Sequence, residues 1–253
     1  MSIELSVGWV LGIALGVVRA GALVSLCALV PRAIPRMARG ILALALGLLI
    51  GEPIAHAATL SASDLVVDAF TNLVIGAVVG WFLGLAIQAF QVAGTIVDLG
   101  SGVTIGSVFD PDTGGSPGPF TRFYTLAAQT LIICAGGLFV VAQVLWASTR
   151  VVALDGRLNG FGLLGAVASS RVSAMFREGV QLALPVAAVL FVAELCFGLL
   201  SRLAPQINMF LIALPAKLLM SLSMMGTAAV LFPRVADHVL HEGVDTAMRL
   251  LGK

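Results

Sequence analysis

Long apolar runs are the feature of this sequence that most limits its fold. Six runs are separated by more polar stretches, and they cover residues 8–30, 41–51, 65–92, 123–146, 180–200 and 209–232. A transmembrane helix needs about 20 mostly apolar residues, a length that only the run 41–51 fails to reach. Charged residues make up 11% of the chain, against roughly 25% in soluble domains. The sequence therefore predicts an all-α integral membrane protein with about six hydrophobic helical segments. We expect helical hairpins within a single membrane-embedded domain over residues 1–253.

The arginine positions conflict with a simple spanning bundle. Positively charged loops stay on the cytoplasmic side of a membrane, and such loops occur at residues 31–40, with three arginines, and 150–177, with four. Three apolar runs separate these loops, so full spanning by all three would place the loops on opposite sides. Either the short run 41–51 turns back without crossing, or the helices do not span in the ordinary way. Both explanations favour a chain buried in a larger assembly, because irregular backbone at membrane depth has to be covered by protein.

Arg19, Glu194 and Lys217 are charged residues that lie within or at the ends of apolar runs. Such charges are costly unless they are paired or hydrated, so each is a candidate for an interhelical ion pair or a polar pathway. Extension to the membrane surface is the alternative; it fits Arg19 poorly and Lys217 better, because Pro215 is expected to begin a helix there. Glu194 lies eight residues before Arg202, on roughly the same helix face. A pairing or pathway role is therefore predicted for Glu194.

Glycines repeat at four-residue spacing inside the third run, at Gly76, Gly80 and Gly84. On a helix, small residues at this spacing form a groove in which a second helix can dock closely. The pattern predicts a helix-packing face. It leaves open whether another subunit or this chain fills the groove.

A stretch rich in glycine and proline connects the third and fourth runs, within an inter-helix loop predicted over residues 98–122. Its composition excludes regular structure. The stretch is either a solvated linker or a flexible loop that occludes a channel. The candidate plug residues are Phe109, Asp110, Pro111, Asp112, Gly114, Gly115, Pro117, Pro119 and Phe120.

The C-terminal tail, residues 233–253, alternates charged with apolar residues. The apolar positions are Val239, Leu240, Val244, Met248 and Leu251. This spacing predicts an amphipathic helix that lies on a membrane surface or on a partner.

Residues that carry enzymatic chemistry do not cluster in this sequence. None of the three histidines lies deep in an apolar run, and the three cysteines are far apart. Ser101 lacks the glycine two positions before it that a nucleophile turn requires. A net charge of +1 gives no basic field that would attract nucleic acid. We therefore expect no enzymatic activity, no catalytic residues, no cofactor and no metal site.

The fifth and sixth runs meet in a polar sequence that is unusual between two apolar helices. It follows the pattern Arg202-x-Ala204-Pro205-Gln206-x-Asn208-x-Phe210, with Glu194 before it and Pro215 and Lys217 after it. This pattern resembles the FliR/SctT family, the export-apparatus proteins of the bacterial flagellum and of the virulence injectisome. The resemblance extends over nearly the whole chain, with an early arginine-rich loop, a glycine-rich third run and a Phe-Asp-Pro loop in the expected order.

The resemblance implies an architecture, partners and a function. Family members assemble as one copy with several copies of FliP/SctR and FliQ/SctS subunits into a closed helical cone. That cone is the inner-membrane gate through which unfolded export substrates enter, and an FlhB/SctU family protein is a further expected partner. For this chain the resemblance implies a multi-pass location in the bacterial inner membrane and a plug role for the loop after the third run. The polar residues of the pattern would form a structural and subunit-contact motif.

Two residues resemble the injectisome branch of the family. Lys217 and Asp98 match that branch, although residues 99–102 lack its polar Asn-Gln-Arg run. The injectisome is therefore favoured over the flagellum.

Other function classes compete with the family as a whole. The main competing class is a secondary transporter with an intramembrane site at Glu194 and Arg202 or Lys217, which would show inverted repeats. An intramembrane protease would need a nucleophile and a base that the sequence does not place.

Overall fold

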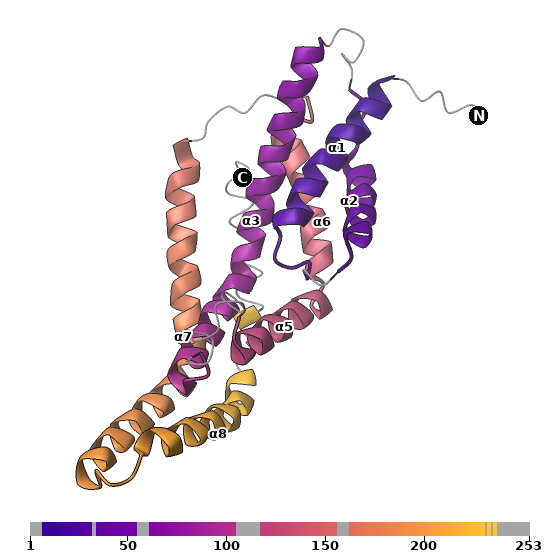
Figure 1. The fold of residues 1–253 in the computed structure, drawn as a ribbon. Coiled ribbons are helices and arrows are strands. Elements are labelled where there is room, and N and C mark those ends of the chain that lie inside the picture. Colours follow the sequence, from indigo (N-terminus) through magenta and orange to yellow (C-terminus); the bar gives the residue numbers. More distant parts are fainter. Residues whose placement is uncertain are drawn as a thin grey trace. The chain divides into compact units, whose positions relative to one another are not determined.

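The structure, a computed structural model, describes residues 7–31, 34–54, 61–104, 117–155, 162–230, 232–233 and 235–236. Within these residues the regular structure is entirely helical, as predicted (Figure 1). The helices are α1 (Val7–Leu26), α2 (Arg36–Ile50), α3 (Ala62–Ser101), α5 (Pro119–Cys134), α6 (Gly137–Val151), α7 (Gly162–Leu203) and α8 (Met209–Ala229). They form two compact units. The first contains the described residues up to 86 and those of 132–172, and the second contains the described residues of 87–131 and 173–236.

Four of these helices are long and apolar enough to cross a membrane: α1, α3, the part of α7 from Ala168 and α8. Helix α2, at 15 residues, is not among them. The predicted second segment is therefore a short helix, as one of the two explanations of the arginine pattern requires.

The fourth apolar run was expected as one helix, and the structure corrects this. Helices α5 and α6 meet at a 71° bend, and together they are long and apolar enough to form one span. Gly136 makes the bend, because its φ of 88° lies in the left-handed region that side chains disfavour. The pair is either a broken span or a re-entrant hairpin, so the described residues contain four or five candidate spans.

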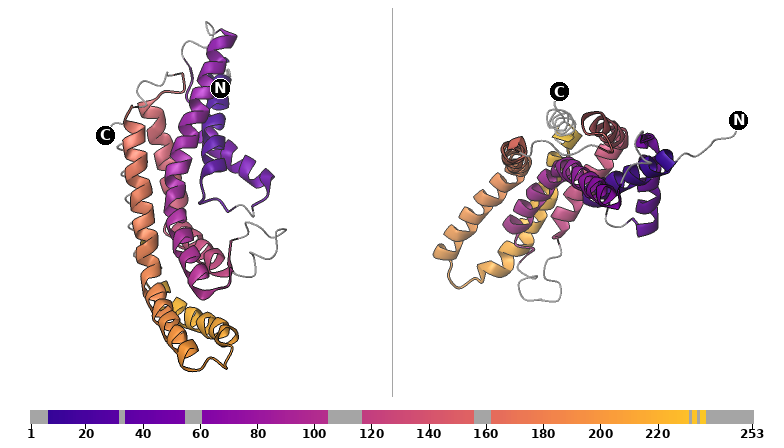
Figure 2. Two further views of the ribbon diagram at one scale, coloured as in Figure 1. Left: turned by 60° about the vertical axis from the view of Figure 1, so that its left-hand side comes forward. Right: turned by 90° about the horizontal axis from the view of Figure 1, so that it is seen from above.

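Helices α1 and α2 of the first unit form a tight antiparallel hairpin. A Cβ atom at Gly16 would lie 2.8 Å from the carbonyl oxygen of Gly47, and one at Gly47 would lie 2.8 Å from the amide nitrogen of Val17. Only glycine permits this approach at either position. The two helices remain adjacent in both views of Figure 2, where α1 is indigo and α2 violet.

The second unit is built on the C-terminal half of α3. Helix α7 runs parallel to it, because Gly179 packs on Ala89 and Leu190 packs near Gly100. Beside these helices, the Phe232 ring lies 4.8 Å from the Tyr124 ring and 5.5 Å from the Phe90 ring, measured between centroids. These buried rings form the aromatic part of the unit's core.

Two predicted boundaries need correction. Pro215 does not begin a helix: it lies inside α8, which starts six residues earlier at Met209, directly after Asn208 at the N-cap position. Proline is tolerated inside membrane helices because local adjustments satisfy the freed backbone groups. The loop predicted over residues 98–122 is also too long at both ends, since α3 continues to Ser101 and α5 begins at Pro119.

Candidate functional site

Arg19 lies at the centre of a buried polar node in the first unit. Its side chain is fully buried. The Nε atom donates to Asn72 Oδ1 (2.8 Å) and Nη1 donates to Ser148 Oγ (3.3 Å). The Nη2 atom donates to the carbonyl oxygens of Val152 (3.0 Å) and Ala153 (3.4 Å). One guanidinium thus joins α1 to α3, to α6 and to the segment after α6.

The node places positive charge where helix α6 ends. Carbonyl groups at a helix C-terminus lack intrahelical partners and carry the negative end of the helix dipole. Arg19 binds two of the carbonyls that follow α6, and Asn72 Nδ2 donates to a third, that of Leu154 (2.7 Å). Arg19 therefore does not extend to the membrane surface. It acts as a cap for α6, and the four acceptors that it binds here are neutral.

The glycine groove of α3 is occupied by this chain. A Cβ atom at Gly76 would overlap the carbonyl oxygen of Arg19, and one at Gly80 would lie 2.5 Å from that of Leu23. At Gly84 the nearest atom is the Ala28 amide nitrogen, at 3.3 Å. The residue numbers of the contacting pairs rise together along the two helices, from Gly76 with Arg19 to Gly80 with Leu23, so α1 runs parallel to α3. The groove brings Arg19 close enough to Asn72 for the polar node to form.

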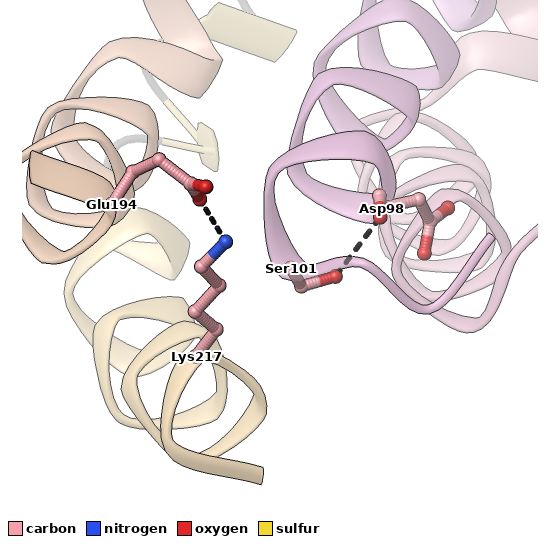
Figure 3. A network of polar contacts seen from close by, with 4 residues as sticks. All are labelled: Asp98, Ser101, Glu194 and Lys217. Carbon is pink, nitrogen blue, oxygen red and sulfur yellow. Dashed lines mark hydrogen bonds and ion pairs between the residues drawn. The ribbon is translucent and has the colours of Figure 1, made fainter. Parts of the chain in front are cut away.

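Glu194 and Lys217 form an ion pair between α7 and α8 in the second unit. Figure 3 shows the Lys217 side chain extending from α8 to the Glu194 carboxylate on α7. The Lys217 side chain is only 12% exposed, whereas that of Glu194 is 64% exposed. Lys217, and not Arg202, is the residue that the structure brings to Glu194.

The polar pattern between α7 and α8 forms an exposed turn. Arg202, Pro205, Gln206, Asn208 and Phe210 are all exposed. Asn208 occupies the N-cap position of α8 but makes no side-chain capping bond. Among the described residues the polar side chains of this turn therefore remain available to other groups.

An apolar cavity of about 560 Å³ borders α8 and the end of α3 in the second unit. Its lining residues are Ser101, Gly102, Val103, Leu214, Pro215, Leu218 and Leu219. Two of these lining residues, Pro215 and Leu218, lie on either side of Lys217 in the sequence. Ser101, also shown in Figure 3, donates its hydroxyl to the main-chain carbonyl of Asp98 (3.0 Å).

Most of the candidate plug lies outside the described residues, namely Phe109, Asp110, Pro111, Asp112, Gly114 and Gly115. The C-terminal tail beyond residue 236 lies outside them as well. Of the remaining candidates, Pro117 and Pro119 are exposed and Phe120 is buried at the start of α5.

Sequence reasoning missed three residues with clear structural roles: Asn72, Ser148 and Thr121. Asp68 and Asn72 are polar residues four apart inside an apolar run, a signal that could have marked one polar face of that helix. Ser148 offered no comparable signal, because a serine near the end of an apolar run is common. Thr121 and Asp98 are bonded to each other across 23 residues, which no local pattern reveals.

The fold and these sites define a polytopic, all-helical membrane protein. No group of three or more potential metal ligands occurs in the part of the chain that the structure describes. Buried polar side chains join helices in both units, and the α7–α8 hairpin of the second unit also carries exposed polar side chains.

The chain belongs to the family described as "Bacterial export proteins, family 1", which it matches over residues 10–243. Its relatives include the flagellar biosynthetic protein FliR of Bacillus subtilis, at 26% identity over 72% of this chain and 71% of the relative. FliR of Escherichia coli is 27% identical over 78% of each chain. The surface presentation of antigens protein SpaR of Shigella flexneri is 27% identical over 60% of this chain and 59% of SpaR. The predicted FliR/SctT family is thereby confirmed, and the chain is an export-apparatus subunit of the type III secretion class.

Proposed function

We propose that this chain is a core subunit of the inner-membrane export gate, where it forms part of the channel for unfolded substrates. The observation that carries the proposal is the exposed Glu194 carboxylate within a candidate span of α7. A carboxylate exposed to lipid is costly even when it has one partner. The face of the α7–α8 hairpin that carries Glu194 therefore requires protein or water against it, as the wall of an assembled gate would provide.

The low burial of α8 within the chain also supports the proposal that the α7–α8 hairpin is covered by other subunits. Within the most apolar 18-residue stretch of α3, 67% is buried in the chain, whereas only 6% of the corresponding stretch of α8 is buried. Apolar surface alone could face lipid, but α8 follows a turn of exposed polar residues. We propose that this hairpin packs against FliP/SctR and FliQ/SctS family subunits. An FlhB/SctU family protein is proposed as a further partner.

The injectisome is the proposed system, in preference to the flagellum. The support is Lys217 and Asp98, which resemble that branch and both hold defined positions in the second unit. Deleting the gene in its own organism tests this assignment. We expect the loss of effector secretion with normal motility, and a non-motile strain that still secretes effectors would contradict it.

We further propose that residues 109–120 plug the channel. The support is the glycine and proline content of this stretch and its placement in the family. Burying one phenylalanine contributes about 1.5–3 kcal/mol, enough to bias a gate without locking it. Deleting residues 112–116 should leave the complex assembled but raise ion conductance in a planar bilayer. An assembled deletion complex that conducts no more than the wild type would show that the loop is an ordinary linker.

The gate itself is tested by secretion. A strain in which Glu194→Lys replaces the native chain should lose secretion, because a second positive charge would then face Lys217. Restoring the pair in the opposite sense, with Glu194→Lys and Lys217→Glu together, should recover part of the secretion. If the single variant secretes normally, the exposed face of the hairpin does not lie in the gate.

A further inference from the structure

The first turn of α5 contains main-chain N–H donors that no residue of α5 itself, and not the residue before it, can cap. The first amides of a helix lack intrahelical partners and are usually bound by a side chain at the N-cap. Gly118, the residue before α5, has no side chain, and Pro119 at the first position has no N–H group. Arg122 N donates to the Gly118 carbonyl oxygen (2.9 Å), so the amides of Phe120 and Thr121 are left over.

Asp98 of α3 supplies the missing cap from a different helix. Its Oδ1 atom accepts the Phe120 amide (3.0 Å), and its Oδ2 atom accepts the Thr121 amide (2.9 Å). Oδ2 also accepts the Thr121 hydroxyl (2.5 Å). The carboxylate is buried and lies at the positive end of the α5 dipole, where negative charge is favourable. All the free donors of this first turn are thus bound by one side chain 20 or more residues away.

The surrounding backbone is shaped to admit this carboxylate. A Cβ atom at Gly118 would overlap the carboxylate atoms of Asp98. One at Gly94 would lie 2.9 Å from the Thr121 amide nitrogen, so the first turn of α5 rests directly on the backbone of α3. The Thr95 and Thr121 hydroxyls, 3.3 Å apart, extend the contact by one more hydrogen bond.

We propose that Asp98 is a positioning residue that clamps the start of α5 to the end of α3, and so fixes both ends of the connection formed by residues 102–118. Residues 98, 118 and 121 are here called the Asp98 clamp. The clamp holds the two ends of this connection at one place, whatever the path of the residues between them.

Three variants break the clamp by different routes. Asp98→Ala removes every acceptor, and Thr121→Val removes one donor while keeping the side-chain shape. Gly118→Ala leaves Asp98 in place but fills the space that its carboxylate occupies. Thr121→Ser keeps the hydroxyl and serves as the matched conservative control. Asp64→Asn alters a carboxylate in the first turn of α3, in the other unit, and controls for loss of charge.

The geometry is measured by continuous-wave electron paramagnetic resonance on the co-purified complex. Spin labels are placed at Leu99→Cys and Arg122→Cys, two exposed positions on either side of the clamp. The native cysteines, Cys27, Cys134 and Cys196, are first changed to serine.

We expect dipolar broadening between the two labels in the wild type, in Thr121→Ser and in Asp64→Asn. We expect that broadening to be lost or reduced in Asp98→Ala and Gly118→Ala, with Thr121→Val between. Unchanged broadening in both Asp98→Ala and Gly118→Ala would overturn the clamp.

Discussion

Arg19 is buried and donates four hydrogen bonds within its own chain, whereas Glu194 is 64% exposed and meets Lys217 on the neighbouring helix. Both residues place a charge inside an apolar helix, where charge is costly. In the first unit the chain supplies the acceptors, including carbonyls at the end of α6. In the second unit the chain leaves one side of the pair open, next to a turn of exposed polar residues.

The difference shows which surfaces of the molecule are complete. The polar node and the glycine groove of the first unit connect α1 to α3 without help from another chain. The α7–α8 hairpin has its ion pair, but its apolar faces and its polar turn have few contacts within the chain. We therefore expect changes in the first unit to lower the stability of the isolated chain, and changes in the hairpin to lower assembly.

The largest effect is expected for Arg19→Ala. The change removes four hydrogen bonds and leaves buried carbonyls unpaired, which should lower the free energy of unfolding by about 3 kcal/mol or more. Unfolding of the detergent-purified chain, followed by tryptophan fluorescence, measures the loss. Arg36→Ala, at an exposed position of α2, is the matched control and should change little. An Arg19→Ala chain as stable as the control would mean that the node does not hold the first unit together.

Gly80→Ala comes next in expected size. Its Cβ atom would lie 2.5 Å from the Leu23 carbonyl oxygen and 2.9 Å from the Leu23 Cα atom. Overpacking of this kind costs about 1–3 kcal/mol, because backbone must move. Gly198→Ala on α7 meets nothing within 4 Å and should leave the unfolding curve unchanged. Equal curves for the two variants would contradict the close packing of α1 on α3.

Glu194→Gln should affect the isolated chain and the complex differently. An exposed ion pair contributes about 0–1 kcal/mol, so unfolding of the isolated chain should shift little. Assembly should fall more clearly, because Lys217 would then be left without its partner at a surface that packs on other subunits. The yield of complex captured through a tagged FliP/SctR-type partner measures this effect. A large loss of stability in the isolated chain with normal complex yield would reverse the comparison.

The smallest effect on stability is expected for Asn208→Ala and Arg202→Ala. Both side chains are exposed, and surface changes usually remain within about 0.5 kcal/mol. We expect near-normal unfolding of each variant but a lower yield of complex. Normal yield with lost secretion would instead assign these residues to the substrate path.

The sequence alone predicted the helical membrane class, the family and a second apolar segment that is too short to span. Apolar run length and charge spacing are local properties, and helices in lipid have little freedom to depart from them. The bend at Gly136 was not predicted, because two adjacent glycines inside an apolar run also fit a straight helix. The partners of Arg19 lie 53 to 134 residues away, and such pairings depend on how helices pack rather than on any local pattern. For the same reason, the sequence marked Asp98 only as a feature of one family branch and not as the cap of another helix.

The central claim is that the α7–α8 hairpin needs other chains to cover it. Native mass spectrometry of the chain, expressed alone and together with its FliP/SctR-type and FliQ/SctS-type partners, tests this claim most directly. We predict that most of the chain expressed alone aggregates or is degraded, so that only a minor fraction is purified in detergent. After co-expression we predict a single copy of the chain among several copies of each partner. A stable, monodisperse monomer or small homo-oligomer that ignores the co-expressed partners would contradict the claim.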